Sequence, residues 1–467
     1  MSEAYPGAAV MDRIEATFME MARDVNFASG AARNAWMFFM ALHAYFFIAL
    51  AGITHRDLLL STAVSLPLLD VDVGLRPFFL FGPLILVLIH FGILLQHAML
   101  ARKIHELHDR VTRFEGQGGF RTHRVRIQLH SYFYTQLIAG PYRSRLFAAF
   151  LSLMTWLTLV IFPVLLLLDF QVTFLPFHDL ATTWAHRVYL VLDLAVMAIF
   201  GIYMRYPSKS FVSGFGANMA QRPLSFMASG LFCMAAIAFS YAVATVPDET
   251  MDRVMAAIPA TRTPVPVGES SGRKPRAAFW PTAMLFEGNV DHLSGRPASL
   301  FGRNLVVTDA DLVRDADFTS GETSISLRRR DLRYGAFDRS DMHQADLTGV
   351  IADGASFRET NLKGFKGERA ELPNTDFWRA LLTNQTLNGQ AVRESQMRRV
   401  NMRNASLGEA NLRFIDLEGA AFEGADLRGA ILDGANLTGA SFAGADLRGA
   451  KIDQKNAAEA QRQGAQF

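Results

Sequence analysis

The sequence predicts a membrane α-helical bundle of about five spans followed by a C-terminal solenoid, and three observations lead to this fold class. Half of the 467 residues are apolar and 19% are charged, which is too much charge for a chain made of membrane spans alone. Long apolar runs fill the chain before residue 247, and a five-residue period fills it after residue 326. A chain of this length has room for two or three separately organised domains.

The N-terminal segment 1–34 is predicted to form an amphipathic helix. Ile14, Phe18, Met21 and Val25 recur at helical spacing. The polar face carries more acidic than basic residues, so attraction to anionic lipid does not explain the segment. We expect its apolar stripe to pack against a partner helix or the membrane-proximal core.

The segment 35–246 is predicted to be a transmembrane helical domain. A span needs roughly 20 apolar residues, and five runs without Lys or Arg approach this length: 35–53, 77–100, 146–168, 188–204 and 224–246. The fourth run is short and contains Asp193, so it decides the topology.

The distribution of basic residues predicts the orientation of these spans. The N-terminus, the basic loop 101–145 and the loop 205–223 together contain 15 Lys and Arg, against three in the opposite short loops. The positive-inside rule therefore predicts a multi-pass protein of the bacterial inner membrane with a cytoplasmic N-terminus and a periplasmic C-terminal domain. If the fourth run does not span, the C-terminal domain would be cytoplasmic instead.

The segment 247–326 is predicted to be a Pro- and Gly-rich linker that leads into an entry cap. Prolines at 259, 264, 266 and 275 prevent a continuous helix. The later stretch "SLFGRNLVVTDADLVRDADF" returns to apolar and acidic alternation, and we expect it to cap the domain that follows.

A five-residue repeat occupies 327–453. From Leu327 to Ile452, 24 of the 26 positions at this spacing are Leu, Phe, Met, Val or Ile, and the exceptions are Ala352 and Gly367. A small residue, most often Ala, commonly stands two positions earlier. The segment 454–467 that follows is predicted to be a polar C-terminal tail or cap.

This pattern resembles the pentapeptide repeat family, whose motif is A(D/N)LXX. The resemblance implies a right-handed, four-sided β-helix in which four repeats form one coil. Phe337, Phe357 and Phe377 are spaced four repeats apart, as are Phe422 and Phe442, so we expect them to stack inside the tube. The membrane half, with "THRDLLL", "LPLLDVDV" and "FLPFHDLATTWAHR", resembles uncharacterised bacterial inner-membrane proteins with a pentapeptide tail, which implies no established activity.

The inward positions of such a tube hold one bulky side chain per face, so larger residues at the alanine sites would overpack it. Recognition must then lie on the outside. A step of four repeats predicts one slot for Arg358, Trp378 and Arg398, with Arg339, Arg379 and Arg399 beside it. Trp and Arg are enriched at binding hot spots, so this face is a candidate site for a protein or an anionic envelope ligand. The alternative is a solvated face neutralised by nearby acidic residues.

Nucleic acid is not predicted as a partner. Soluble members of the family that mimic nucleic acid have markedly acidic surfaces, whereas residues 327–452 carry 18 basic and 17 acidic side chains. The membrane lipid bilayer is the one environment that the apolar runs require, and the sequence leaves oligomerisation open.

Polar residues gather in the two loops that the topology places outside. We expect mutual hydrogen bonds to fix these loops, and a metal or ligand site is the alternative, although no HxxxH spacing supports one. No cofactor is predicted. The residues of this outer-loop cluster are His55, Asp57, Asp70, Asp72, His178, Asp179 and His186.

Within the predicted spans, His90, His97 and Asp193 are candidate intramembrane polar residues, and His43 lies in the first span. Interhelical hydrogen bonds explain them most simply, and a proton or ion pathway is the alternative.

No catalytic constellation emerges, so an enzyme is not predicted. The triplet "HRD" at 55–57 resembles a kinase catalytic loop, but Thr62 stands where the motif needs Asn. We therefore expect a membrane-anchored scaffold or binding protein that displays a rigid β-helix. The alternative is a transporter, channel or membrane enzyme whose β-helix is accessory.

Overall fold

The computed structural model describes most of the chain. The described residues are 6–66, 71–115, 122–141, 144–243, 262–265, 276–279, 290–291, 296–297, 302–313, 323–382 and 397–467. The chain forms two compact units. The first comprises Met1–Gly52, Pro77–Gln171 and Trp184–Ser240, and the second comprises Ile53–Arg76, Val172–Thr183 and Tyr241–Phe467.

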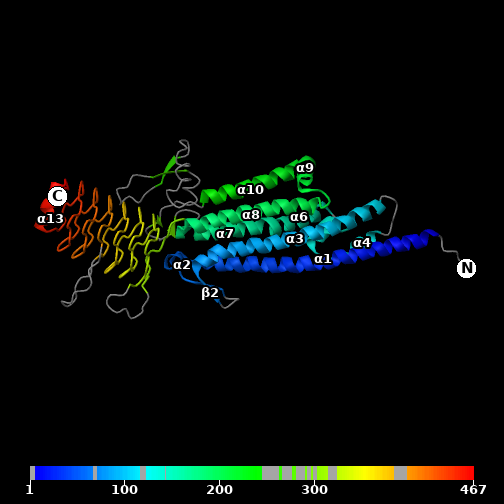
Figure 1. Ribbon diagram of the computed structural model, residues 1–467, viewed down its shortest axis with the longest axis horizontal. Helices are drawn as coiled ribbons and strands as arrows, with labels where there is room; N and C mark the ends of the chain where they lie inside the picture. Colours follow the sequence, from blue (N-terminus) through cyan, green and yellow to red (C-terminus); the bar gives the residue numbers. More distant parts are fainter. Residues whose placement is uncertain are drawn as a thin grey trace. The chain divides into compact units, whose positions relative to one another are not determined.

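The first unit contains long helices that lie side by side (Figure 1). Five stretches are long and apolar enough to cross a membrane, as predicted: Arg13–Ala51, Leu75–Phe114, Arg145–Phe177, Leu180–Arg205 and Pro223–Tyr241. They belong to α1 (Pro6–Ala51), α3 (Leu75–Glu115), α6 (Arg145–Trp156) with η1 (Leu157–Ile161), α7 (Phe162–Phe174) and η2 (Leu175–Phe177), α8 (Leu180–Arg205) and α10 (Pro223–Val243).

The fourth apolar helix, α8, is longer than the run 188–204 that the sequence indicates, because it already begins at Leu180. Its first turns contain Thr182, Thr183 and His186, which are polar but buried. A hydropathy pattern cannot recognise such residues as part of a span, because their polar atoms are satisfied only by neighbours in the folded chain.

The N-terminal segment continues into the first span without interruption, because α1 is one helix from Pro6 to Ala51. Phe18 and Val25 of its apolar stripe are buried in a core with Leu107 and Val125, so the stripe packs as expected. The predicted basic loop 101–145 is largely helical rather than irregular, since α3 runs to Glu115 and is followed by α4 (Thr122–Ile127) and α5 (Phe133–Ala139). The loop 205–223 likewise contains α9 (Phe211–Gln221).

The second unit begins with the segments that connect these helices. Residues 53–76 contain α2 (His55–Leu60) and an antiparallel pair formed by β1 (Val64–Leu66) and β2 (Val71–Val73). Within 247–326, β3 (Arg262–Val265) pairs with β4 (Arg276–Phe279), and β5 (Val290–Asp291) pairs with β6 (Arg296–Pro297).

The repeats form a four-sided β-helix whose stacked coils run from yellow to red in Figure 1. Each coil pairs with the next through single parallel bridges, such as Asp331 with Ile351 and Ile351 with Glu371. The step of four repeats per coil is therefore confirmed over these coils. At the end, α13 (Gln454–Arg462) leads to Gln466, which pairs with Asp446 of the last coil.

The core of the β-helix contains the predicted aromatic stacks. Ring centroids are 4.9 Å apart for Phe337 and Phe357, and 5.2 Å apart for Phe357 and Phe377. Phe422 and Phe442 stack at 5.2 Å. The exception at Gly367 also has an explanation, since a Cβ there would lie 2.8 Å from the Phe365 ring. The bulky side chain has moved to the position normally held by alanine.

The regular step of four repeats fails at two places, where the paired positions lie six repeats apart. Val306 pairs with Ala336, and Glu371 pairs with Asn401. Residues 314–322 and 383–396, which fall inside these longer steps, lie outside the described part of the chain. Each longer step contains two repeats more than a regular coil. The five-residue pattern in the sequence therefore continues unbroken across it and gives no sign of the extra length.

Candidate functional site

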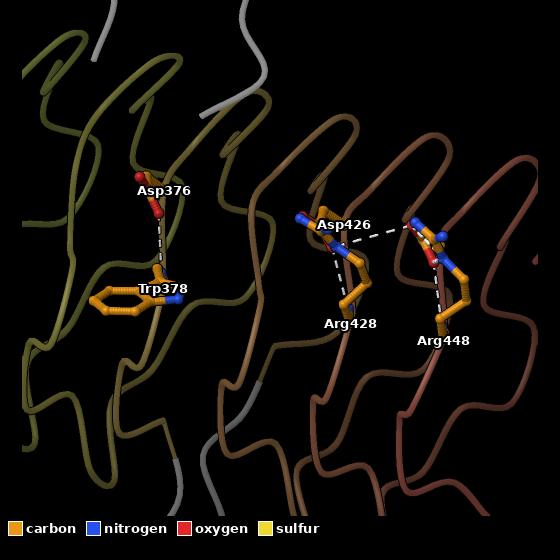
Figure 2. Close-up of polar contacts among 6 residues, drawn as sticks. Asp376, Trp378, Asp426, Arg428 and Arg448 are labelled. Carbon is orange, nitrogen blue, oxygen red and sulfur yellow. Dashed lines mark hydrogen bonds and ion pairs between the residues drawn. The ribbon is translucent and has the colours of Figure 1, made fainter. Parts of the chain in front are cut away.

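The outward residue Trp378 lies on a column that runs along one side of the β-helix. Ser356 pairs with Asp376, Asp376 with Ser406, Ser406 with Asp426, and Asp426 with Asp446. The residues two positions further on therefore lie one above another. We call this set the Trp378 column, and Figure 2 shows Trp378, Arg428 and Arg448 in equivalent positions on their coils. Its members are Arg358, Trp378, Gly408, Arg428 and Arg448.

The Trp378 indole is half-buried between two guanidinium groups rather than fully exposed. The Arg358 Cζ lies 4.8 Å from the ring centroid, and the Arg379 Cζ lies 4.3 Å from it. The Trp378 backbone N–H donates to Asp376 Oδ1 at 3.0 Å. On the next coil Gly408 lies beside the ring, and a Cβ there would be in van der Waals contact with Trp378 Cδ1 at 3.4 Å.

The prediction that Arg398 shares a slot with Trp378 is wrong. Arg369 N–H donates to the Arg398 carbonyl, so Arg398 follows Glu368 and Arg399 follows Arg369 across the longer step. Arg398 and Arg399 therefore lie on a different side from Trp378. The predicted face is divided in two, and Arg339, Arg358 and Arg379 remain with Trp378.

Acidic partners accompany the arginines of this side. Arg339 pairs with Asp309 at 2.5 Å and Arg379 with Glu409 at 2.8 Å. Along the column, Arg428 contacts Asp426 at 2.7 Å and Arg448 contacts Asp446 at 2.6 Å (Figure 2). Hydrogen bonding from Arg448 lowers the pKa of Asp446. The surface therefore alternates positive and negative groups and is not a uniformly cationic strip. Exposed pairs of this kind contribute little to stability, so a partner can replace them at small cost.

The outer-loop residues do not form one cluster. Asp57 caps α2, accepting from Thr54 and Thr62, and Asp72 accepts from Ser65 across the β1–β2 pair. Asp179 accepts from Arg76 Nη2 at 2.5 Å; burial alone would raise its pKa, but this bond outweighs burial and lowers it.

His186 lies in the first unit, where its Nε2 donates to the Phe79 carbonyl at 2.7 Å. Asp70 lies outside the described residues. In the described part of the chain, no group of three or more His, Cys, Asp or Glu is placed to hold a metal ion.

His55 and His178 both contact the start of the β-helix. His55 Nδ1 accepts from the Val306 N–H at 3.0 Å, and burial lowers the pKa of His55. His178 Nε2 donates to the Arg303 carbonyl at 2.9 Å, and its Nδ1 lies 3.4 Å from Asp331 Oδ1. Burial alone would raise the pKa of Asp331, but the close contact with His178 and the hydrogen bonds from Arg333 outweigh burial and hold the pKa well below its usual range.

Arg330 makes a buried contact that the sequence does not predict. Its Nη1 donates to the Leu59 carbonyl at 3.2 Å and to Ser61 Oγ at 3.1 Å, while Nη2 donates to the Leu58 carbonyl at 3.2 Å. Its Cζ lies 4.0 Å from the Phe177 ring centroid, and burial lowers the pKa of Arg330 to about 10. Arg330 thus satisfies the last carbonyls of α2 and binds residues 53–61 and Phe177 to the first coil. In the sequence it is one of three consecutive arginines, and nothing distinguishes it from its neighbours.

Two of the predicted intramembrane residues are joined. His90 Nδ1 and Asp193 Oδ1 are 2.7 Å apart, and neither residue has exposed surface. His97 is separate: its Nδ1 donates to the Ile93 carbonyl at 2.8 Å, and its Nε2 lies 2.6 Å from the Tyr132 hydroxyl. The His90–Asp193 contact therefore joins α3 to α8, and the His97–Tyr132 contact joins α3 to the residue before α5.

Comparison with known proteins identifies the repeats. The model of pentapeptide repeats matches eight copies, over residues 326–364, 395–434 and 415–454. No curated protein matches this chain.

Several solved structures match about a third of the chain at low sequence identity. A pentapeptide repeat protein from the Arabidopsis thaliana thylakoid lumen is 20% identical, and the match covers 31% of this chain and 80% of that one with a TM-score of 0.19. The plasmid-mediated fluoroquinolone resistance protein QnrB1 is 14% identical over 34% of this chain and 96% of its own, with a TM-score of 0.15. HetL, a pentapeptide repeat protein of the cyanobacterium Nostoc involved in heterocyst differentiation regulation, is 24% identical. The match covers 31% of this chain and 85% of HetL, with a TM-score of 0.12. The fold of the C-terminal region rests on its own paired coils and on the repeat match.

Proposed function

Because the C-terminal region consists of pentapeptide repeats, we propose that the protein is a membrane-anchored scaffold that binds a partner along one side of its β-helix. The observation that carries the proposal is Trp378, a large aromatic residue held at the surface between Arg358 and Arg379. Desolvated Trp and Arg side chains contribute most of the binding energy in many interfaces. Each cation–π contact here adds about 0.5–2 kcal/mol when a partner covers the site.

The anchoring of the β-helix supports a display role. Residues 53–76 and 172–183, which connect successive apolar helices, belong to the same compact unit as the repeats. Arg330, His55 and His178 bind these segments to the first coil. These contacts hold the connecting segments and the first coil together within one unit, so the repeats are more than a domain on a free tether.

The same contacts favour a periplasmic β-helix in a bacterial inner membrane. The segments 53–76 and 172–183 follow the first and third apolar helices, so five spans put them on the side opposite the basic N-terminal segment. The positive-inside rule assigns that side to the periplasm. The expected partner is then an acidic protein or an anionic polymer of the cell envelope, which would exchange its carboxylates or phosphates for Asp426 and Asp446.

Photocrosslinking in intact membranes tests the proposal. A photoreactive amino acid replaces Arg428 or Arg448 in the Trp378 column, and Arg403, which pairs with Glu423 on another side, is the matched control position. We expect crosslinked partner from the column positions, its loss with Trp378→Ala, and little product from position 403. Equal yields from both sides, or yields that Trp378→Ala leaves unchanged, would contradict a binding role for this side.

A further inference from the structure

The helical unit contains a buried polar cluster where three apolar helices meet. His90 comes from α3, Asp193 from α8, and Leu159 from the π-helical turn η1. Besides its contact with Asp193, His90 approaches the Leu159 carbonyl with its Nε2 at 3.2 Å. A π-helical turn shifts the backbone ladder to i→i+5 bonds, and such turns are frequent at functional sites. Here the carbonyl of that turn receives a side-chain donor.

The hydrogen-bond chemistry fixes how many protons the cluster holds. A carbonyl only accepts, so Nε2 of His90 must carry a proton. Nδ1 and a carboxyl oxygen at 2.7 Å would repel each other through their lone pairs unless a second proton lies between them. The pair therefore holds one shared proton and is neutral in sum, as imidazolium with carboxylate or as imidazole with carboxylic acid. Loss of that proton leaves a negative charge in the apolar interior, which is costly unless another group takes the proton nearby.

An acceptor for the proton lies in the same cluster. His43 on α1 donates from Nδ1 to the Phe39 carbonyl at 2.8 Å, so Nε2 of the neutral ring is an acceptor. Nε2 of His43 and Oδ2 of Asp193 are both buried, and among the described residues neither has a hydrogen-bond partner. The Phe39 ring contacts both histidines, with centroids 4.2 Å from His43 and 5.1 Å from His90.

A further acceptor, His97, lies on α3 itself, C-terminal to His90. His97 is two helical turns from His90, which is about 10 Å. Its Nδ1 donates to the Ile93 carbonyl, so its Nε2 accepts from the Tyr132 hydroxyl. The titratable groups around the cluster thus come from α1, α3, α8, α5 and the residue before α5, while η1 contributes only a carbonyl. They are His43, His90, His97, Tyr132, Tyr134 and Asp193.

We propose that His90 and Asp193 form the central proton-binding site of a proton pathway through the helical unit. The shared proton leaves the pair for Nε2 of His43, which becomes imidazolium, and the pair becomes anionic. A proton arriving from the side of His97 restores the neutral pair. One proton enters for each proton that leaves, and no electron is transferred. This activity belongs to the helices and does not depend on what the β-helix binds.

Proton flux into liposomes tests the pathway. The purified full-length protein is reconstituted in vesicles that enclose a pH-sensitive dye, and a potassium gradient with valinomycin supplies the driving voltage. We expect wild-type vesicles to acidify at least several-fold faster than protein-free vesicles. Asp193→Asn keeps a hydrogen-bonding side chain of equal size but cannot release the proton, and its flux should fall to the protein-free rate. Asp169→Asn in α7, which alters a carboxylate outside the cluster, is the matched control and should keep wild-type flux.

A second variant separates the pathway from folding. His43→Gln leaves the His90–Asp193 pair intact, so it should fold like the wild type, as judged by size-exclusion profile and melting, and still lose flux. Wild-type flux equal to that of protein-free vesicles, or full flux in Asp193→Asn, would reduce the pair to an interhelical bond. Full flux in a folded His43→Gln variant would remove His43 from the path and overturn the pathway as proposed.

Discussion

At the scale of single residues, the inward and outward positions of the β-helix obey different constraints. Ala425 has 1% of its surface exposed, whereas Arg428 is exposed and paired only with local carboxylates. Interiors are packed at crystal-like density, so an added ring at an inward alanine has no space. Outward side chains can change with little effect on the tube.

Ala425→Phe should destabilise the repeat domain by about 1–3 kcal/mol or more through overpacking. Arg428→Ala removes exposed ion pairs only, so it should leave the melting temperature close to that of the wild type. Thermal melting of the two full-length variants in detergent, followed by β-sheet circular dichroism, measures the difference. Equal melting behaviour of both variants would contradict the assigned register.

Local exchanges of size also preserve the tube at the residue scale. Val350 is buried two positions before Ala352, and Phe365 is buried two positions before Gly367. In both repeats a bulky residue occupies the usual alanine position, and a small residue occupies the usual position of Leu or Phe. The volume inside the coil is conserved although the motif is violated, which is the condition for tolerated core changes.

At the scale of elements, the connection between the short helix α2 and the first coil depends on Arg330. The guanidinium group replaces the hydrogen bonds that the C-terminal carbonyls of α2 lack, and its flat face covers the Phe177 ring. The planar guanidinium group of an arginine can donate these hydrogen bonds and stack on the ring at the same time, whereas the ammonium group of a lysine cannot. The contact explains why segments far apart in sequence form one compact unit.

Arg330→Met should weaken this connection, because it leaves the Leu58 and Leu59 carbonyls without their donor. The expected cost is about 1–3 kcal/mol for buried polar groups that lose their partner. Hydrogen exchange measured by mass spectrometry should show faster exchange in residues 55–60 and in the first coil, with α3 and α8 unchanged. Arg328→Gln is the control, because it removes an exposed guanidinium group from the same coil, 3.7 Å from Asp346 on the next coil. Exchange that is no faster in Arg330→Met than in Arg328→Gln would argue against the anchor.

At the scale of the whole molecule, the number of spans decides the side on which the β-helix lies. Five apolar helices and the excess of basic residues around the N-terminal side predict a periplasmic C-terminus. An alkaline phosphatase fused after Phe467 should therefore be active in bacterial cells, and a fluorescent protein that matures only in the cytoplasm should be dark at the same position. The reverse pattern would mean that one apolar helix, α8 or α10, does not span.

The sequence by itself determined the two kinds of architecture. Apolar runs of membrane length require helices, because only helices and closed barrels satisfy the backbone in lipid. The period of five and the spacing of Phe337, Phe357 and Phe377 likewise predicted the coil length and the aromatic stack. Both signals are local or strictly periodic, so they can be read along the chain without knowledge of its path.

Tertiary structure alone decided which residues meet. The six-repeat step that pairs Glu371 with Asn401 places Arg398 and Arg399 on a different side from Trp378. A five-residue pattern does not reveal this step, because the inserted length is two full repeats. The contact of His90 with Asp193 and the contact of Arg330 with α2 join residues that lie more than a hundred positions apart. Such contacts depend on how helices and coils pack in three dimensions, and hydrogen-bond partners at that distance leave no periodic signal in the chain.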